Sequence, residues 1–324
     1  MIRVSCLVLL SAIGAGCAEN PQVVALALPG GAAGIGLDDL RYSAAMASVL
    51  VPAGRTGNVD VVDGRTHAVV AISGFSAATE FDGGHDFGAT SVEEVDGTLY
   101  VTDRTTEQLY VVDPVSGAIT ASVPLAASPD YVRFTGSELW VTEPDAEQIE
   151  VFSLVGPTSI ATVAVPGGPE SLVIDRVRGR AYAHAEGGLS VAIDLALREV
   201  VDTWSNGCET PKGIALDAAH GLLVIGCGEG KLVALDVAGT GEVRGELVYG
   251  NGIDVLGYDQ GRRHLYAPAG KTGTLGIVEL GTDGALRLAA SVATASGAHC
   301  ATSDGAGTVY VCDPVGGRLL VVTD

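Results

Sequence analysis

The chain has 324 residues, of which 47% are hydrophobic and 5% aromatic, and it contains 45 glycines. This composition favours many short strands joined by tight turns over long helices. With 39 acidic residues against 18 basic ones, the formal charge of -21 argues against a nucleic-acid partner and against an anionic membrane surface, because both require clustered lysine and arginine.

The first residues, MIRVSCLVLLSAIGAGC, have the layout of a secretory signal. Arg3 precedes an apolar core from Val4 to Ile13, and small residues then lead to Cys17. The apolar run is too short for a permanent transmembrane helix. We therefore expect residues 1–16 to be a signal peptide and the protein to be exported.

The end of this signal, GAGC at positions 14–17, resembles a bacterial lipoprotein signal, in which the cysteine becomes the lipidated first residue. Gly14 stands where that signal usually has a leucine. Ordinary cleavage after Ala18 is the alternative, since the residues around it are small. We favour lipidation of Cys17, with residues 17–22 as a short tether, and expect membrane contact only through this anchor.

A sevenfold repeat fills the rest of the chain. One marker of its second strand recurs at intervals of 50, 40, 42, 42, 42 and 44 residues. It consists of Leu50, Tyr100, Trp140, Tyr182, Val224, Tyr266 and Tyr310. A second marker, which closes a third apolar run and which we interpret as a turn stabiliser, consists of Asp63, Asp113, Ser153, Asp194, Asp236, Glu279 and Thr323. This period predicts an all-β domain over residues 23–324, a seven-bladed β-propeller.

The seventh repeat stops after its third strand, at RLLVVTD. An apolar segment from Val23 to Leu28 precedes the first repeat. Because an open sheet edge favours aggregation, we predict that this segment supplies the missing strand and closes the ring. A lipoprotein tether without fixed structure is the alternative, and the apolar character of the segment argues against it.

The stretch LYVTDRTTEQLYVVDPVSGAITASVPL, Leu99 to Leu125, followed by SPDYVRF, resembles the YVTN-type β-propeller repeat. In that repeat a Tyr-Val-Thr-Asn strand precedes a Val-Asp turn and a proline-containing entry to the next inner strand. Asp103 and Glu143 stand where the family has asparagine. The resemblance implies the seven-bladed fold and an envelope location, and no single function.

Function is expected at the mouth of the channel, where the innermost strands begin. Counting back from the second-strand marker places there Asp38 or Asp39, Thr90, Asp130, Glu170, Lys212, Asp254 and His299. The second strands end on the same face at Asp103, Glu143 and Asp313. An insertion from Ser73 to Ala89 brings Glu80, Asp82, His85 and Asp86 to this face, and long connections often carry function.

The carboxylates at the mouth predict a divalent-cation site. Four carboxylates, from Asp38 or Asp39, Asp130, Glu170 and Asp254, converge on one axis, and His85 and Asp86 can reach over them. Like charges raise one another's pKa, and a hard cation such as Ca²⁺ would keep them ionised. In the alternative interpretation Lys212, water and distance already separate the charges, and His299 only lines the channel.

Export leaves four cysteines in an oxidising compartment, and they allow three connectivities. Cys300 and Cys312 flank one hairpin symmetrically, whereas Cys208 precedes the inner strand of blade five and Cys227 ends its second strand. We predict the disulfides Cys208–Cys227 and Cys300–Cys312. No closely spaced pair of the kind that structural zinc requires occurs among them.

Three classes of function fit this sequence. We rank first a binding or interaction scaffold that holds an unknown protein or small-molecule ligand at its acidic mouth. A divalent-metal-dependent hydrolase of lactonase type, using the mouth carboxylates, is the alternative. A redox partner ranks third, because no Cys-x-x-Cys-His haem attachment is present, and we expect no cofactor other than a divalent cation. Two common hydrolase motifs, Gly-x-Ser-x-Gly and His-Glu-x-x-His, are absent.

Overall fold

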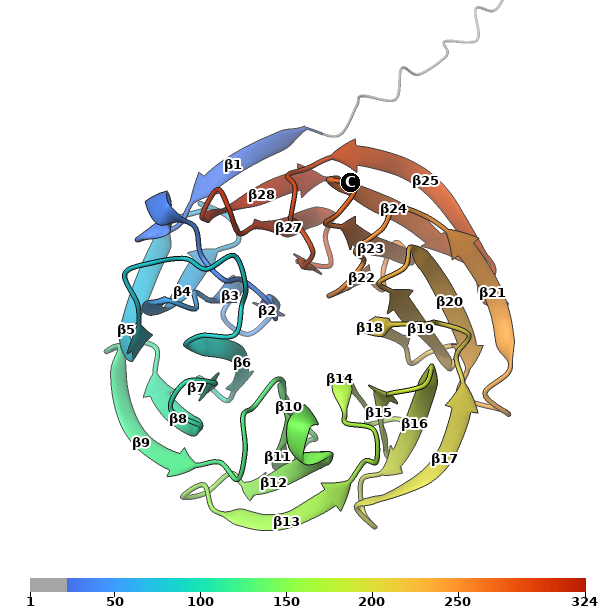
Figure 1. The fold of residues 1–324 in the computed structure, drawn as a ribbon, viewed down its shortest axis with the longest axis horizontal. Coiled ribbons are helices and arrows are strands. Elements are labelled where there is room, and N and C mark those ends of the chain that lie inside the picture. The colour runs from blue at the N-terminus through green and yellow to red at the C-terminus, as the bar shows by residue number, and fades with distance from the viewer. Residues whose placement is uncertain (1–21) are drawn as a thin grey trace, which may run out of the picture.

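The computed structural model describes residues 22–324 as seven four-stranded antiparallel sheets arranged in a ring (Figure 1). The predicted all-β, seven-bladed β-propeller is thereby confirmed. The predicted signal peptide and the lipidation site at Cys17 lie outside the described residues.

In six blades the strands follow one another in chain order from the channel outward, and in the seventh β26, β27 and β28 are followed by β1 at the outside. In chain order they are β1 (Val23–Ala27), β2 (Arg41–Ser43), β3 (Ser48–Pro52), β4 (Thr56–Asp63), β5 (Val69–Ala77), β6 (Ala89–Val95), β7 (Thr98–Asp103), β8 (Gln108–Asp113), β9 (Ala118–Pro124), β10 (Val132–Phe134), β11 (Glu138–Glu143), β12 (Gln148–Ser153), β13 (Ser159–Ala164), β14 (Glu170–Asp175), β15 (Arg180–Ala185), β16 (Leu189–Asp194), β17 (Glu199–Ser205), β18 (Pro211–Asp217), β19 (Leu222–Cys227), β20 (Lys231–Asp236), β21 (Val243–Val248), β22 (Gly257–Asp259), β23 (His264–Ala269), β24 (Thr274–Leu280), β25 (Leu286–Ala293), β26 (Ala301–Ser303), β27 (Thr308–Asp313) and β28 (Arg318–Thr323). Two short 3₁₀ helices, Gly31–Ala33 and Pro144–Ala146, complete the described elements.

The hydrophobic core lies between neighbouring blades. Each of the seven blade interfaces in the described chain holds one cluster of buried apolar side chains. The second strand of each blade packs against both neighbouring blades, because its alternate side chains point to opposite faces of the sheet. For example, every residue of β19 is buried. The repeated marker packs here, with Trp140, Tyr182, Tyr266 and Tyr310 almost fully buried.

The aspartates that end the third strands stabilise the turns that follow. Asp63 Oδ1 accepts hydrogen bonds from the backbone N–H groups of Arg65 and Thr66, at 3.0 and 2.6 Å. Asp194 Oδ1 accepts two equivalent bonds, both at 2.9 Å. The predicted structural role of this marker is confirmed.

The N-terminal strand completes the last blade. β1 pairs antiparallel with β28, in a register that runs from Val23 opposite Val322 to Ala27 opposite Arg318. Figure 1 shows β1, in blue, along the outer edge of β28, in red. The predicted closure by the segment from Val23 is therefore present in the structure.

Backbone contacts continue this closure beyond the strand. The N–H of Leu28 donates to the carbonyl of Gly317 at 3.2 Å. A Cβ atom on Gly31 would lie only 2.0 Å from that carbonyl oxygen, so the two chain segments can approach this closely only with glycine at position 31. The side chains of residues 23–28 bury less apolar surface than their sequence predicts. Val24 is 55% exposed, whereas Leu28 is 5% exposed and lies in the core.

The insertion before blade two is shorter than predicted. Ser73 to Ala77 continue the outer strand β5, so the connecting loop covers only residues 78–88. The Arg55 side chain fixes its start, donating to the carbonyls of Ala78 at 3.2 Å and Gly34 at 2.7 Å. The loop is thus tied to the closing segment and reaches the mouth from there.

Deleting residues 23–28 tests the closure. The deletion removes the pairing with β28 and the buried Leu28 side chain, so the free energy of unfolding should fall by several kcal/mol. Chemical denaturation of the full and shortened proteins measures this difference. Deletion of residues 18–21 is the length control, and equal unfolding midpoints for the two deletions would contradict closure by β1.

One buried carboxyl group lacks a partner in the described residues. Asp60 on β4 is fully buried, and neither of its side-chain oxygens has a hydrogen-bond partner there. Burial raises the pKa of Asp60 to about 7. Because the folded state then holds a proton that the unfolded state releases, stability should fall as the pH rises from about 4 to about 7.

The Asp60→Asn variant should lose this dependence on pH. Its stability relative to the wild type should increase by about 3 kcal/mol between pH 5 and pH 8, since each pKa unit corresponds to about 1.4 kcal/mol. Denaturant unfolding at several pH values measures it. Asp202→Asn, at an exposed position on β17, is the matched control. A stability difference that stays constant with pH would show that Asp60 is not the titrating group.

Candidate functional site

Three clefts surround the axis on the face where the inner strands begin, and we call this face the mouth. They have volumes of about 640, 450 and 500 Å³, and Lys212 lines all three. Glu170 lines the second and third clefts. The clefts are contributed by blades two to seven, so the mouth is a shared surface of the ring.

Most of the sequence-predicted mouth residues lie where they were expected. Glu170 and Lys212 are the first and second residues of β14 and β18, and the other four precede their inner strands by two or three residues. These are Asp38, Asp130, Asp254 and His299. Thr90 lies at the start of β6, and its buried hydroxyl lacks a hydrogen-bond partner among residues 22–324.

Asp38 and Asp39 have different environments, which the sequence could not separate. Asp38 faces the mouth, whereas Asp39 lies deeper in the channel and accepts two hydrogen bonds from the Arg133 guanidinium, at 2.7 and 2.8 Å. The Ser91 hydroxyl donates to the same carboxylate at 2.5 Å. Arg133 also lies over the ring of Tyr131, 4.8 Å from its centroid. This buried network joins the inner strands of blades one, two and three.

Arg104 is a second cation that the sequence analysis missed. It follows directly after β7 and donates to Asp130 and, at 3.1 Å, to Asp86 Oδ1. Its guanidinium is also 3.9 Å from Asp38 Oδ2. The sequence could have indicated Arg104, because it follows Asp103, which the repeat places at the end of a second strand on the mouth face.

The structure does not bring Asp130, Glu170 and Asp254 together as ligands of one metal ion. Arg104 binds Asp130, and Lys212 Nζ donates to Glu170 Oε1 at 2.8 Å. In the described part of the chain, the oxygens of Asp130, Glu170 and Asp254 form no group within 4.8 Å of one another. Lysine and arginine already neutralise two of these carboxylates, as the alternative interpretation of Lys212 expected.

Asp254 has no cation in direct contact with its carboxylate in residues 22–324. Burial, followed by the negative charge of Asp38, raises the pKa of Asp254 to about 6, against the opposing effect of His299 and Lys212.

A different group converges at the mouth, namely Asp38, His85 and His299. Potential ligand atoms of these three side chains lie within 4.8 Å of one another. His85 Nδ1 is 3.3 Å from Asp38 Oδ2, and the two imidazole centroids are 5.4 Å apart. The Asp38 charge raises the pKa of His85 to about 9. Burial opposes ionisation of Asp38, but His85 and Arg104 hold the pKa of this carboxyl well below its usual value.

The acidic residues that end the second strands have a structural role. Asp103, Glu143 and Asp313 are buried and accept backbone hydrogen bonds. Asp103 Oδ2 accepts from Ser76 N at 2.8 Å, Glu143 Oε1 from Ala126 N at 3.1 Å, and Asp313 Oδ1 from Gly316 N at 3.0 Å. Although they were placed on the functional face, none of them lines a mouth cleft. They anchor the connections around the mouth.

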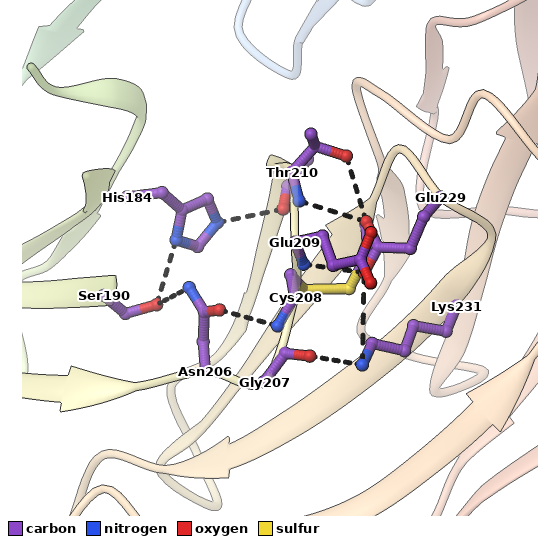
Figure 2. Close-up of a disulfide and its surroundings, with 11 residues drawn as sticks. His184, Ser190, Asn206, Gly207, Cys208, Glu209, Thr210, Glu229 and Lys231 are labelled. Carbon is purple, nitrogen blue, oxygen red and sulfur yellow. Dashed lines mark hydrogen bonds and ion pairs between the residues drawn. A yellow bond between two sulfur atoms is a disulfide. The ribbon is translucent and has the colours of Figure 1, made fainter. Parts of the chain in front are cut away.

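Both predicted disulfides, Cys208–Cys227 and Cys300–Cys312, are present in the structure. Figure 2 shows the first of these with the polar network around it. Glu229 accepts hydrogen bonds from the backbone N–H groups of Glu209 and Thr210, at 2.9 and 3.1 Å. The bridge and this network fix the segment that enters blade five, and its residues line the largest mouth cleft.

Comparisons with known proteins support the fold. No family model matches the chain, and no curated protein matches it. Among solved structures, a chain of the Mitotic Checkpoint Complex is 15% identical with a TM-score of 0.77, covering 100% of this chain and 98% of that one. Hydrazine synthase of Kuenenia stuttgartiensis is 14% identical with a TM-score of 0.75, covering 90% and 96%. The Cps50 (Swd1) β-propeller domain of Myceliophteria thermophila is 11% identical with a TM-score of 0.74, covering 94% and 100%. At these identities the likeness shows the propeller fold alone.

Within residues 22–324, no helix is long and apolar enough to cross a membrane.

The buried pair of Arg133 and Asp39 gives a prediction about stability. Arg133→Met leaves the Asp39 carboxylate buried without its cation, which should lower the free energy of unfolding by about 3–5 kcal/mol. Adding Asp39→Asn to that variant should recover part of the loss. Denaturant unfolding measures both. Arg287→Met, which breaks the exposed pair with Glu279, is the control and should cost less than about 1 kcal/mol. Equal losses for the two arginine variants would refute the role of the buried pair.

Proposed function

We propose that this chain is an exported envelope protein of the YVTN type, anchored by lipid at Cys17, whose mouth binds a protein or small-molecule partner. The observation that carries the proposal is the set of three clefts around Lys212. Concave surfaces with a few placed charged groups are where proteins bind ligands. The disulfide at the largest cleft keeps that surface formed before a partner arrives.

Two further observations support a binding role. The mouth presents both signs of charge, with Lys212 and Lys271 beside Glu209 and Glu229 in the largest cleft, which suits a polar partner. One structurally similar chain is part of the Mitotic Checkpoint Complex, an assembly in which a propeller takes part. That precedent concerns the fold, which commonly serves as an interaction scaffold.

The lactonase-type hydrolase is the second candidate. Its predicted metal ligands Asp130, Glu170 and Asp254 do not lie close together in the structure. We therefore rank the hydrolase below the binding scaffold. The group of Asp38, His85 and His299 keeps it a candidate, since a metal there would be open to the clefts.

Site-specific photo-crosslinking in the native envelope tests the binding role. A crosslinker at Glu186, on the rim of one mouth cleft, should give a defined adduct. The same group at Val177, in the turn after β14 on the opposite face, should give none. Lys212→Ala should abolish the Glu186 adduct. For small molecules, a thermal-shift screen of the wild type against Lys212→Ala is the parallel readout. Equal adducts from both faces, or no adduct and no shift, would contradict the proposal.

The lipid anchor predicts the behaviour of a Cys17→Ser variant. Without an acyl chain the acidic protein has little affinity for membranes, so the variant should appear in the soluble exported fraction. Membrane fractionation measures this, with Cys6→Ser as the control within the same signal. An unchanged distribution of the Cys17→Ser protein would point to ordinary cleavage after Ala18.

A further inference from the structure

We propose that Asp38, His85 and His299 form a binding site for a divalent first-row transition-metal ion such as Zn²⁺. This site shares Asp38 and His85 with the calcium site expected from the sequence, but it has His299 in place of Asp130, Glu170 and Asp254, and its ligands suit a different class of metal. It does not rest on the proposed binding of a partner, because an ion can bind whether or not a partner does.

The fold brings the three side chains together from distant parts of the chain. Asp38 precedes β2 of blade one, His85 lies in the loop of residues 78–88, and His299 precedes β26 of blade seven. Their potential ligand atoms lie within 4.8 Å of one another, whereas ligands about 2.0–2.2 Å from one ion lie roughly 3–4 Å apart. A shift of about 1 Å would complete the site. The backbone of Gly84 and His85 packs closely against Gly36, where a Cβ atom would lie 2.5 Å from the Gly84 carbonyl oxygen, so the shift would come from rotation of the side chains.

His299 is oriented as a metal ligand would be. Its Nδ1 atom is 2.7 Å from the carbonyl oxygen of Gly297. Because a carbonyl only accepts hydrogen bonds, Nδ1 carries the proton and Nε2 presents a lone pair. That Nε2 atom is buried and has no hydrogen-bond partner in the described chain. A backbone carbonyl behind one ring nitrogen and an open lone pair on the other is the usual arrangement of a metal-binding histidine.

The charges at the mouth favour a cation at this position. Around this group, five carboxyl groups outnumber the permanent cations Arg104 and Lys212, and these two cations are bound mainly to carboxylates other than Asp38. The five are Asp38, Asp86, Asp130, Glu170 and Asp254. Arg104 contacts Asp130 and Asp86 more closely than Asp38, so His85 is the nearest cationic partner of the Asp38 carboxylate. An ion at the site replaces the proton shared by Asp38 and His85, and that proton passes to solvent.

The ligand set selects the class of metal. Two imidazoles and one carboxylate suit zinc and its neighbours in the first transition row, whereas calcium requires six to eight oxygens. Three protein ligands leave at least one coordination position open. His299 lines the cleft of about 640 Å³ and His85 the cleft of about 450 Å³, so that position would be accessible to a ligand entering the mouth.

Calorimetric titration of Zn²⁺ into the chelator-treated exported protein tests the site. We expect one ion per chain with sub-millimolar affinity, and no comparable binding of Ca²⁺. His85→Gln should weaken zinc binding at least about 10-fold, a loss typical of disturbing a metal site. Asp82→Asn removes a negative charge from the same loop without touching the group, so it should leave the affinity within about twofold.

Two further measurements keep the test decisive. Asp38→Asn should weaken zinc binding as His85→Gln does, with thermal unfolding as the check that this variant is folded. Co²⁺ in place of Zn²⁺ should give visible absorption bands typical of mixed nitrogen and oxygen ligands, and His85→Gln should remove them. Absence of zinc binding would overturn the proposal. Equal zinc affinity in wild type and His85→Gln would also overturn it, because the ion would then be held elsewhere.

Discussion

The pairing of β1 with β28 is the constraint on which the rest of the molecule depends. It joins the two ends of the described chain, so that β1 covers the edge of β28 and blade seven has four strands like the other blades. The close approach of Gly31 to Gly317 continues the joint toward the mouth. The seam is also packed, because the cluster between blades seven and one includes Leu28 and Leu319. Closing the ring here is what brings Asp38, before the inner strand of blade one, close to His299 in blade seven.

The mouth depends on a second physical condition, the balance of buried charge. Carboxylates at the starts of several inner strands would repel one another in a partly buried site. Arg104, Lys212 and Arg133 each come from a different blade, and each neutralises a carboxylate of another blade. Because fixed side chains supply most of the compensation, the mouth can hold its shape without an ion at the predicted carboxylate triad. The Asp38 carboxylate differs from the others, because its nearest positive charge is the proton on His85, and a metal ion can replace that proton.

The sequence predicted the blades well because two independent markers keep one period. The end of the third strand at Asp63 or Asp194 and the packing of Tyr182 follow directly from that repeat. The disulfides were also accessible, since positions on either side of a hairpin lie opposite each other once the strands are known. The pairing of β1 with blade seven was predictable because the seventh repeat lacks a fourth strand of its own.

The details of the site were less accessible, for identifiable reasons. The repeat tells which residues begin each inner strand, but adjacent residues such as Asp38 and Asp39 point in different directions, and a difference of one position decides which faces the mouth. Arg104 belongs to a connection after a second strand, and Arg133 lies inside an inner strand, so neither falls at a counted position. The sequence could therefore list the carboxylates without showing which cation each one meets.

Anomalous X-ray scattering from crystals of the exported protein grown with Zn²⁺ can show whether closure of the ring brings residues from both ends of the described chain into one mouth site. If it does, an anomalous peak should lie within bonding distance of Asp38, His85 and His299 together. A peak among Asp130, Glu170 and Asp254 instead, or an empty mouth in crystals that hold zinc elsewhere on the protein, would contradict this expectation.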